Sequence, residues 1–558
     1  MIFSPLEKLE SNSSSPPRRP LAIMSFFMLI TLGLALARLF ELTVIRGKEN
    51  RVRADENRIL VRPIHAPRGV ILDRNGIALT RNVPSIRQID FPGDDLGPVP
   101  IEEAARDYPF GSALAHIIGY VGEVSPEELG PLAAGDIVGK SGLEKQYDSL
   151  LRGTDGADLI EVDANGKTLR TISTQAPISG QNLAVNLDAN LSVAALSSLS
   201  GKKAAVAALD PADGSVLALV SSPSFDPQDL VPALKDSDNF PLFNRPVSGE
   251  YPPGSIFKLV TASAGLSEAK INSSTLIEDT GEIRVGEFRY GNWYFDQYGR
   301  TEGAINITRA ITRSNDIFFY RVGEWLGPQA LADWARRLGL GQKTGVDLPS
   351  EAAGLIPDPQ WKQRQIGEKW YLGNTYHMAI GQGDVQVTPL QVAQMAAAVL
   401  TGQKCRPQIQ KTENRKQKTE ECQDVGLSEQ NRNLILSGMV GACSPGGTAF
   451  PFFQWNEKGL TFADAKVRPY EPIVACKTGT AQHGGAKTMP HAWIVVTGPI
   501  KTSESSEGPT LGEAKVGPFG LDLDSPKRII LVVLVEESGE GSAVAAPLAK
   551  QILTEWFK

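Results

Sequence analysis

The stretch Tyr251-Pro252-Pro253-Gly254-Ser255-Ile256-Phe257-Lys258 places a serine where a turn rich in Pro and Gly becomes a helix. Ser255 and Lys258 are three residues apart, so they lie on one face of that helix, one turn from each other. The hydroxyl stands at the helix N-terminus, where the dipole stabilises a developing negative charge. Apolar residues flank Lys258, and burial there would lower the pKa of its amine from about 10.4. The stretch therefore predicts a serine nucleophile with its own lysine base.

The spacing Ser-x-x-Lys alone is a weak signal, because the chain contains it twice more. Ser200 and Lys203 stand in polar sequence before a predicted strand. Ser267 and Lys270 stand at the far end of the helix that Ser255 begins, where the dipole has the opposite sign. The local context therefore favours Ser255.

A second motif, Lys477-Thr478-Gly479-Thr480, continues the apolar run at 473–476, so we expect it on a strand. A strand edge can offer backbone hydrogen bonds to an extended peptide, while the lysine and threonine side chains can bind a carboxylate. Another Lys-Thr-Gly, at 343–345, has the surroundings of a loop. The later copy is therefore the candidate binding strand.

A third motif, Ser314-Asn315-Asp316, lies where one apolar helix gives way to another. From there the Ser314 hydroxyl could relay a proton between Lys258 and a leaving group. A Ser-Asp-Asn sequence also occurs at 237–239, but it precedes Ser255 and lies in a charged loop.

Apolar runs indicate strands at both ends of the region that holds these motifs. They lie at residues 204–209, 215–220, 472–479, 491–497 and 528–535. Helical periodicity occurs around residues 255–269, 303–311, 317–338 and 387–400, and returns at 543–556. Strands from both ends with helices between them imply one antiparallel sheet packed by helices, an α+β domain. Polar inserts at 401–424 and 501–526 are expected to be loops.

Residues 46–186 have a different character. Short strand-like segments alternate with Gly and Pro turns, and no dense cluster of titratable residues is evident. This pattern predicts a β-rich, non-catalytic pedestal. We therefore expect a tail at 1–20, an anchor at 21–43, the pedestal at 44–186 and the catalytic domain at 187–558.

The expected anchor begins with residues 21–37, which carry no charge. Together with the residues up to 43, they can form a helix long enough to cross a bilayer. Arg18 and Arg19 precede them, so the positive-inside rule places the N-terminus in the cytoplasm and the rest of the chain outside the inner membrane. Two alternatives are a signal peptide cleaved near Ala35-Leu36-Ala37 and a buried core helix.

The composition is that of an ordinary folded protein. The 558 residues carry a formal net charge of −7, which argues against nucleic acid as the main partner. Five His and four Cys are too few for a metal cluster or a disulfide scaffold. Cys405 and Cys422 bracket the first polar insert, and a disulfide and two free thiols are both compatible with that placement. Cys476 is expected to pack inside the sheet, and His491 to be structural because Lys258 already supplies a base.

The order Ser-x-x-Lys, Ser-x-Asp and Lys-Thr-Gly resembles the class B penicillin-binding proteins. Further stretches extend the resemblance over nearly the whole chain, among them residues 38–40, 66–76, 139–153, 251–258, 380–391, 491–493 and 536–547. The resemblance implies the penicillin-binding transpeptidase fold behind a single membrane helix. It also implies D,D-transpeptidation, in which a serine attacks the penultimate D-Ala carbonyl of a peptidoglycan stem peptide and passes the acyl group to an amine of a neighbouring stem.

The resemblance also implies a role for each matching residue. Ser255 would be the nucleophile, Lys258 its base and Ser314 a proton relay. The resemblance also implies that several residues hold the substrate, and that the second motif binds its carboxylate. These residues are Asp316, Lys477, Thr478, Gly479 and Thr480. The backbone amides of Ser255 and Thr480 would form the oxyanion hole. No cofactor is implied. Some relatives carry a metal between the Ser-x-x-Lys motif and the Ser-x-Asp motif, but no His or Cys lies between Lys258 and Ser314, so we expect no metal.

Residues 56–67, Asp316 and Trp370-Tyr371 resemble the elongation-type members. A resemblance to these members implies a SEDS-family glycosyltransferase and other membrane elongation proteins as partners. It also implies that β-lactams acylate the serine as mimics of the substrate. The alternatives are a division-type transpeptidase, a D,D-carboxypeptidase or endopeptidase, and a membrane-anchored β-lactam sensor. A β-lactamase is disfavoured, because single-domain lactamases lack the pedestal.

Overall fold

The computed structural model describes residues 18–56, 58–89, 99–130, 132, 135–163, 168–412, 422–456, 472–484, 488–502, 510–511, 514–515 and 519–558. The chain divides into two compact units. The first comprises residues 1–66, 86–103 and 154–178, and the second comprises residues 67–85, 104–153 and 179–558.

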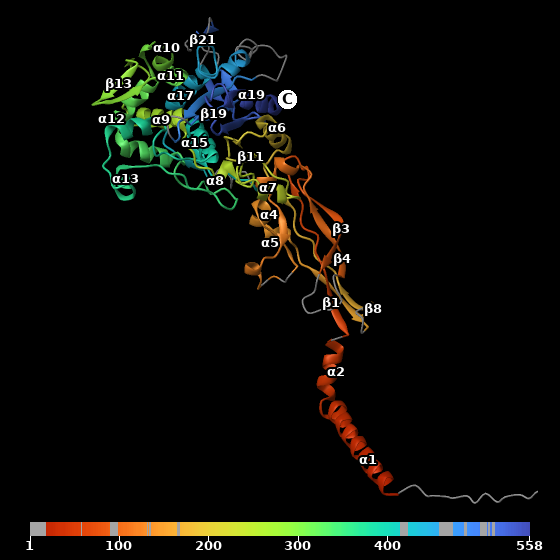
Figure 1. Ribbon diagram of the computed structural model, residues 1–558. Coiled ribbons are helices and arrows are strands. Elements are labelled where there is room, and N and C mark those ends of the chain that lie inside the picture. Colours follow the sequence, from red (N-terminus) through yellow and green to blue (C-terminus); the bar gives the residue numbers. More distant parts are fainter. Residues whose placement is uncertain are drawn as a thin grey trace, which may run out of the picture. The chain divides into compact units, whose positions relative to one another are not determined.

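The first unit begins with a long apolar helix. Helix α1 spans Arg18–Phe40, a π-helical turn follows at Glu41–Ile45, and α2 spans Gly47–Glu56 (Figure 1). The apolar segment Ala22–Ile45 is long enough to cross a membrane, and none of its most hydrophobic window is buried. A buried core helix would have its apolar side chains covered, so that alternative is wrong for this segment.

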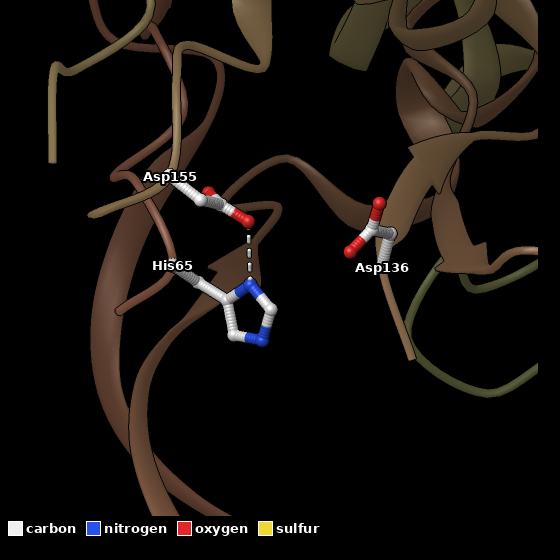
Figure 2. Close-up of side chains that lie close together, drawn as sticks. All are labelled: His65, Asp136 and Asp155. Carbon is white, nitrogen blue, oxygen red and sulfur yellow. Dashed lines mark hydrogen bonds and ion pairs between the residues drawn. The ribbon is translucent and has the colours of Figure 1, made fainter. Parts of the chain in front are cut away.

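The first unit also contains a three-stranded antiparallel sheet. Its order is β1-β7-β8, with bounds Ile59–Ile64, Gly156–Val162 and Thr168–Gln175. Asp155 joins two of these strands at their ends: its carboxylate accepts hydrogen bonds from the Ala66 amide at 2.7 Å and contacts His65 Nδ1 at 2.9 Å (Figure 2). Because His65 follows β1 and Asp155 precedes β7, these contacts fix the register at one end of the pair.

The second unit contains short elements before its main sheet. Strand β2 (Ile71–Leu72) pairs in parallel with β9 (Leu183–Ala184). Strands β5 and β6 pair with each other, and so do β3 and β4, whose residues are divided between the two units. The bounds of the remaining elements here are Arg81–Ile89 (β3), Val99–Asp107 (β4), Ala115–Ile118 (α3), Val121–Glu123 (β5), Ile137–Gly139 (β6), Gly142–Gln146 (α4) and Asp148–Leu151 (α5).

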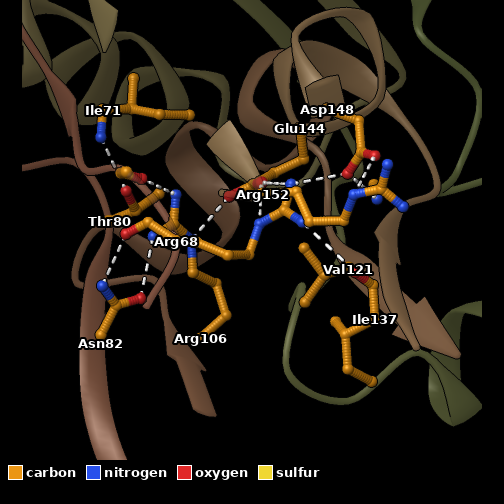
Figure 3. Close-up of polar contacts among 12 residues, drawn as sticks. Arg68, Ile71, Thr80, Asn82, Arg106, Val121, Ile137, Glu144, Asp148 and Arg152 are labelled. Carbon is orange, nitrogen blue, oxygen red and sulfur yellow. Dashed lines mark hydrogen bonds and ion pairs between the residues drawn. The ribbon is translucent and has the colours of Figure 1, made fainter. Parts of the chain in front are cut away.

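A buried ionic network holds these elements together (Figure 3). The fully buried Glu144 carboxylate accepts hydrogen bonds from Arg106 Nε at 2.7 Å and Arg68 Nη2 at 2.9 Å. Arg68 Nη2 also contacts Asp148 Oδ1 at 2.9 Å, and Arg106 Nη1 donates to Asn82 Oδ1 at 3.1 Å. The sequence of residues 46–186 shows no dense titratable cluster, but residues distant in that sequence meet in the fold to form this network.

The main sheet of the second unit has the order β11-β10-β24-β19-β18, and every neighbouring pair is antiparallel. The strands span Val216–Ser222, Ala204–Leu209, Ile529–Val535, His491–Gly498 and Ala475–Ala481, in that order. These bounds match the five apolar runs of the sequence, and the predicted α+β fold is confirmed. Among the described residues, strand β18 lies at the edge of the sheet and pairs with β19 alone.

Alternate residues of a strand point to opposite sides of the sheet, and here both sides are apolar. Helices cover each of these faces. Val206, Ile494 and Val533 share a core with α6 (Ala189–Leu199) and the C-terminal α19 (Ala545–Phe557). Ala205, Val495 and Val532 share a second core with α9 (Lys258–Ser267), α12 (Asp316–Arg337), α15 (Pro389–Thr401) and α17 (Glu429–Ala442). The second core supports the candidate motifs.

Smaller elements surround this framework. One predicted helix begins later than expected, because residues 303–305 form a strand before α11 (Ile307–Arg313). The other short helices are Val231–Lys235 (α7), Arg245–Ser248 (α8), Trp293–Tyr298 (α10), Pro359–Gln365 (α13) and Leu372–Ala379 (α14). The short strands are Ile277–Asp279 (β12), Glu282–Val285 (β13), Phe288–Gly291 (β14), Gly303–Ile305 (β15), Gln403–Cys405 (β16), Cys422–Asp424 (β17), Ile500–Thr502 (β20), Thr510–Leu511 (β21), Ala514–Lys515 (β22) and Phe519–Leu521 (β23).

All four cysteines are paired. Cys405 and Cys422 form a disulfide that joins β16 to β17 and closes the first polar insert, with 4.0 Å between their Cα atoms. Cys476 is fully buried in β18, as expected, but it is also bonded to Cys443 at the end of α17. The sequence interpretation missed this second pairing. Residues 413–421 of the first insert and parts of the second lie outside the described residues.

Candidate active site

Ser255 lies in a short 3-10 turn, Gly254–Phe257, that leads directly into α9. Gly254 has φ 55°, and a Cβ at this position would lie 2.6 Å from the carbonyl oxygen of Thr480. A side chain is therefore excluded on two grounds, the backbone conformation and the contact with β18. The absence of a side chain at Gly254 lets the turn that carries Ser255 pack directly on the edge strand.

Lys258 is one helical turn further along and is fully buried. Its Nζ donates hydrogen bonds to the Ser314 carbonyl oxygen at 2.7 Å and to Asp316 Oδ1 at 2.7 Å. The same amine lies 3.3 Å from Ser314 Oγ. The first and third motifs of the sequence are thus in direct contact.

Ser314 connects α11 to α12 in the left-handed backbone conformation, with φ 52°. Asn315 then caps α12 by accepting a hydrogen bond from the Phe318 amide at 2.9 Å. Lys477 Nζ, also fully buried, donates to Ser314 Oγ at 2.8 Å and to the Thr478 carbonyl oxygen at 2.9 Å. The Ser314 hydroxyl therefore lies between two lysine amines.

The two amines differ in how readily they lose their charge. Burial lowers the pKa of Lys258, and the contact with the Asp316 carboxylate opposes this shift. Burial and the neighbouring positive charge of Lys258 lower the pKa of Lys477 well below its ordinary value. Lys258 donates directly to the Asp316 carboxylate, whereas Lys477 donates to a hydroxyl and a carbonyl oxygen, so a positive charge is better compensated at Lys258. This finding qualifies the expectation that Lys258 is the neutral amine.

A cleft of about 1200 Å³ brings the three motifs together. Its lining includes Ser255, Ser314, Asp316, Thr478 and Thr480. The amines of Lys258 and Lys477 lie beneath this surface, and Gly479 is on the same strand. Among the described residues that line the cleft, none comes from the rejected Ser-x-x-Lys pairs, from 237–239 or from 343–345.

Strand β18 presents a free edge to this cleft. The Thr480 carbonyl oxygen accepts a hydrogen bond from Gln382 Nε2 at 3.2 Å, so the Thr480 backbone points away from β19. Because the N–H and C=O of one strand residue point to the same side, the Thr480 amide faces the cleft as well. The Thr478 hydroxyl donates to Thr448 Oγ1 at 2.9 Å, and the Gly541 amide lies 3.4 Å from Thr480 Oγ1. The strand edge is thus held in place and open to a ligand.

His491 does not line the cleft. Its Nδ1 accepts a hydrogen bond from the Glu537 amide at 3.1 Å, and its ring stacks on His483 with 4.0 Å between centroids. Burial, together with the neighbouring His483, lowers the pKa of His491 to about 4, so the ring is neutral at physiological pH. These contacts favour the structural role over a catalytic one.

The sequence interpretation missed a group of aromatic residues that line the same cleft as β18. Trp293, Tyr294 and Tyr298 of α10 line the cleft together with Tyr290 and Tyr320. The Trp293 amide donates to Asp316 Oδ2 at 3.0 Å, which ties this group to the third motif. The available signal was five aromatic residues within the nine positions 290–298.

Comparison with known proteins identifies the family. The sequence model of the penicillin-binding protein transpeptidase domain matches residues 204–504, and that of the penicillin-binding protein dimerisation domain matches residues 88–185. Peptidoglycan D,D-transpeptidase MrdA of Escherichia coli K12 is 31% identical over an alignment that covers 96% of this chain and 93% of that protein. MrdA of Acinetobacter baumannii is 34% identical over 67% of this chain and 66% of that protein.

Solved structures agree with this assignment. Pseudomonas aeruginosa PBP2, solved with WCK 5153, has a TM-score of 0.69 and 31% identity, covering 89% of this chain and 96% of that one. Helicobacter pylori PBP2, solved with MreC, has a TM-score of 0.71 and 26% identity, covering 88% and 98%. The chain belongs to the penicillin-binding protein transpeptidases. Within them it is a class B member, most similar to the elongation type, and a serine-type D-Ala-D-Ala transpeptidase.

Proposed function

We propose that the protein cross-links peptidoglycan stem peptides through an acyl-enzyme on Ser255 during elongation of the lateral wall. The observation that supports this most strongly is that Ser255, the Ser314 hydroxyl between two buried amines and the free edge of β18 meet at one cleft. A nucleophile, a proton path and a peptide-binding edge are the parts that acyl transfer from a peptide requires.

The donor stem peptide extends along the edge of β18 in this proposal. Lys477 and the Thr478 and Thr480 hydroxyls hold its terminal carboxylate. Gly479 contributes backbone alone, since a Cβ there would lie 2.9 Å from Ile256 Cγ1. The amides of Ser255 and Thr480 receive the oxyanion. Asp316 borders the same cleft from α12 and orients Lys258.

Binding of the carboxylate prepares the base. A negative charge beside Lys477 favours the protonated form of that amine. The Ser314 hydroxyl contacts both amines, at 2.8 Å and 3.3 Å, so a proton can pass from Lys258 to Lys477 through it. Lys258 is then neutral and can accept the proton of Ser255. The substrate thereby generates the free base at the moment of use.

The bonds change in two steps. Ser255 Oγ bonds to the penultimate D-Ala carbonyl carbon, its proton goes to Lys258, and the C–N bond to the terminal D-Ala breaks as a proton returns to the leaving amine through Ser314. An amine of a second stem peptide then attacks the ester carbonyl, gives up a proton and restores the Ser255 hydroxyl. The products are free D-Ala and a new amide cross-link.

Labelled penicillin tests this proposal on the purified protein. We expect a covalent adduct at Ser255 that persists for many minutes, no adduct in Ser255→Ala, and normal labelling in the matched controls Ser200→Ala and Ser267→Ala. Rapid release of the label would indicate a β-lactamase, and absence of label would refute the acyl-enzyme. With a stem-peptide substrate, D-Ala release without a cross-linked product would indicate a carboxypeptidase.

We also propose that the catalytic domain lies outside the inner membrane and works with elongation proteins, including a SEDS-family glycosyltransferase. Arg18 and Arg19 before the apolar helix support this orientation, and two disulfides fit an oxidising compartment. The solved complex of Helicobacter pylori PBP2 with MreC supports a partner of this kind. Protease added to spheroplasts should digest the catalytic domain; protection of that domain would contradict this orientation.

A further inference from the structure

The residue directly before Lys477 is covalently held. Cys476 is fully buried in β18 and is bonded to Cys443, which follows α17 and is fully buried as well. Their Cα atoms are 5.5 Å apart, within the usual range for a disulfide. The bond therefore joins the edge strand of the candidate active site to the end of a core helix.

A second contact links the same two segments on the other side of Lys477. After Cys443 the chain runs to Gly447 and Thr448, which line the cleft. Thr448 Oγ1 accepts the hydrogen bond from Thr478 Oγ1 at 2.9 Å. Strand β18 is thus fixed to residues 443–448 at positions 476 and 478, which flank Lys477.

An edge strand depends on such ties more than an inner strand does. Strand β18 pairs with β19 on one side and faces the cleft on the other, so ladder hydrogen bonds hold it from one side. Lys477 Nζ must remain 2.8 Å from Ser314 Oγ for the proton path described above. A displacement of about 1 Å at a reacting group can cost about 100-fold in rate.

We propose that Cys443 and Cys476 are positioning residues: their disulfide fixes β18 so that Lys477 reaches Ser314, and it thereby sets the rate at which Ser255 is acylated. This inference rests on the proposed function. The disulfide of Cys405 and Cys422 provides a matched control, because it closes an insert whose described residues do not line the cleft.

The test compares two double variants of the full chain by the second-order rate of labelling with penicillin. Cys443→Ala with Cys476→Ala should be acylated at least about tenfold more slowly and should show an altered pH profile of acylation, since Lys477 is no longer held beside Lys258. Cys405→Ala with Cys422→Ala should retain the rate within about twofold. Thermal unfolding of each variant establishes that it is folded at the assay temperature. Equal rates and pH profiles for the first variant and the unsubstituted protein would overturn the proposal.

A further variant tests whether the effect comes from the covalent bond or from the packing of the two side chains. Cys443→Ala with Cys476→Val restores apolar volume without the bond, and we expect it to remain slow. Recovery of the full rate by this variant would assign the effect to packing and overturn the positioning role of the disulfide.

Reduction of the unsubstituted protein covers the case in which a variant does not fold. A phosphine reductant and water convert the S–S bond into two thiols and the phosphine oxide. Aliquots are assayed for labelling while parallel aliquots are alkylated and mapped by mass spectrometry. The labelling rate should fall with the fraction of molecules reduced at 443 and 476, and free thiols at these positions before reduction would overturn the proposal. If the oxidised protein takes no label, the proposed function itself fails; if the oxidised and reduced forms label equally fast, this inference alone fails.

Discussion

The amine of Lys477 donates a 2.8 Å hydrogen bond to the hydroxyl of Ser314. The two residues are 163 positions apart in sequence, and one comes from the edge strand of the sheet while the other joins two helices. Lys477 is fully buried and Ser314 is nearly so, and charge interactions are stronger in such surroundings than in bulk water. The fate of a proton at this contact decides which lysine can act as a base.

Removal of the Ser314 hydroxyl should interrupt that path. We expect Ser314→Ala to lower the acylation rate by about 100-fold, the lower range for loss of a positioned proton-transfer group. Ser263→Ala is a suitable control, because the buried Ser263 hydroxyl donates to the Leu259 carbonyl oxygen within α9. The measurement is the rate of penicillin labelling for each variant. A Ser314→Ala protein that acylates at the normal rate would exclude the relay.

The pH dependence of acylation should report the Asp316 carboxylate. Lys258 is active as a base when neutral, so the rate rises with pH through its pKa and then levels off. The Asp316 contact raises that pKa against the lowering effect of burial. Asp316→Asn removes the opposing charge, lowers the pKa of Lys258 further and should move the rising limb to lower pH. A shift of the limb to higher pH would contradict this assignment.

An exposed hydrogen bond joins two segments that line the cleft. Gln297 Nε2 of α10 donates to Glu540 Oε1, after β24, at 2.8 Å, and both residues line the cleft. A typical hydrogen bond contributes about 1 kcal/mol, so its loss should favour separation of these two segments by about fivefold. We expect Gln297→Ala to accelerate acylation by bulky β-lactams by up to about fivefold. The rate of acylation by small β-lactams should be unchanged. A slower reaction with bulky compounds would show that the contact aids binding instead.

The buried ionic network around Glu144 should stabilise the folded protein. Glu144→Gln leaves the guanidinium groups of Arg68 and Arg106 without their shared buried counter-charge, which should cost about 3 kcal/mol of unfolding free energy. Denaturant unfolding, followed by circular dichroism, measures the loss. Glu555→Gln is the control, because Glu555 forms an exposed ion pair with Lys558, and such pairs contribute less than about 1 kcal/mol. Equal stability of the two variants would contradict the assigned importance of the network.

The sequence predicted features that depend on short-range pattern. The five strands of the main sheet were evident as apolar runs, since buried strands have few polar positions. Ser255 and Lys477 were selected over rival copies of their motifs by local context, and both lie at the cleft or directly beneath it. Selecting these residues required only their neighbours in the sequence.

Features that depend on long-range contact were not predicted. Glu144 meets Arg68 across 76 positions, and Cys443 meets Cys476 across 33. No periodicity marks such pairs, because each partner has an unremarkable neighbourhood of its own. The contact between Lys258 and Asp316 also opposes the lowering of the Lys258 pKa by burial, and a three-residue motif carries no information on that distance.

Gly254 has a consequence for drug resistance. Any side chain there would meet the carbonyl oxygen of Thr480, so a cell under antibiotic selection cannot alter this position without separating its nucleophile from the strand that grips the substrate. Resistance mutations should instead accumulate on α10 and on the segment after β24. Side chains there line the cleft but do not pack against the turn that carries Ser255.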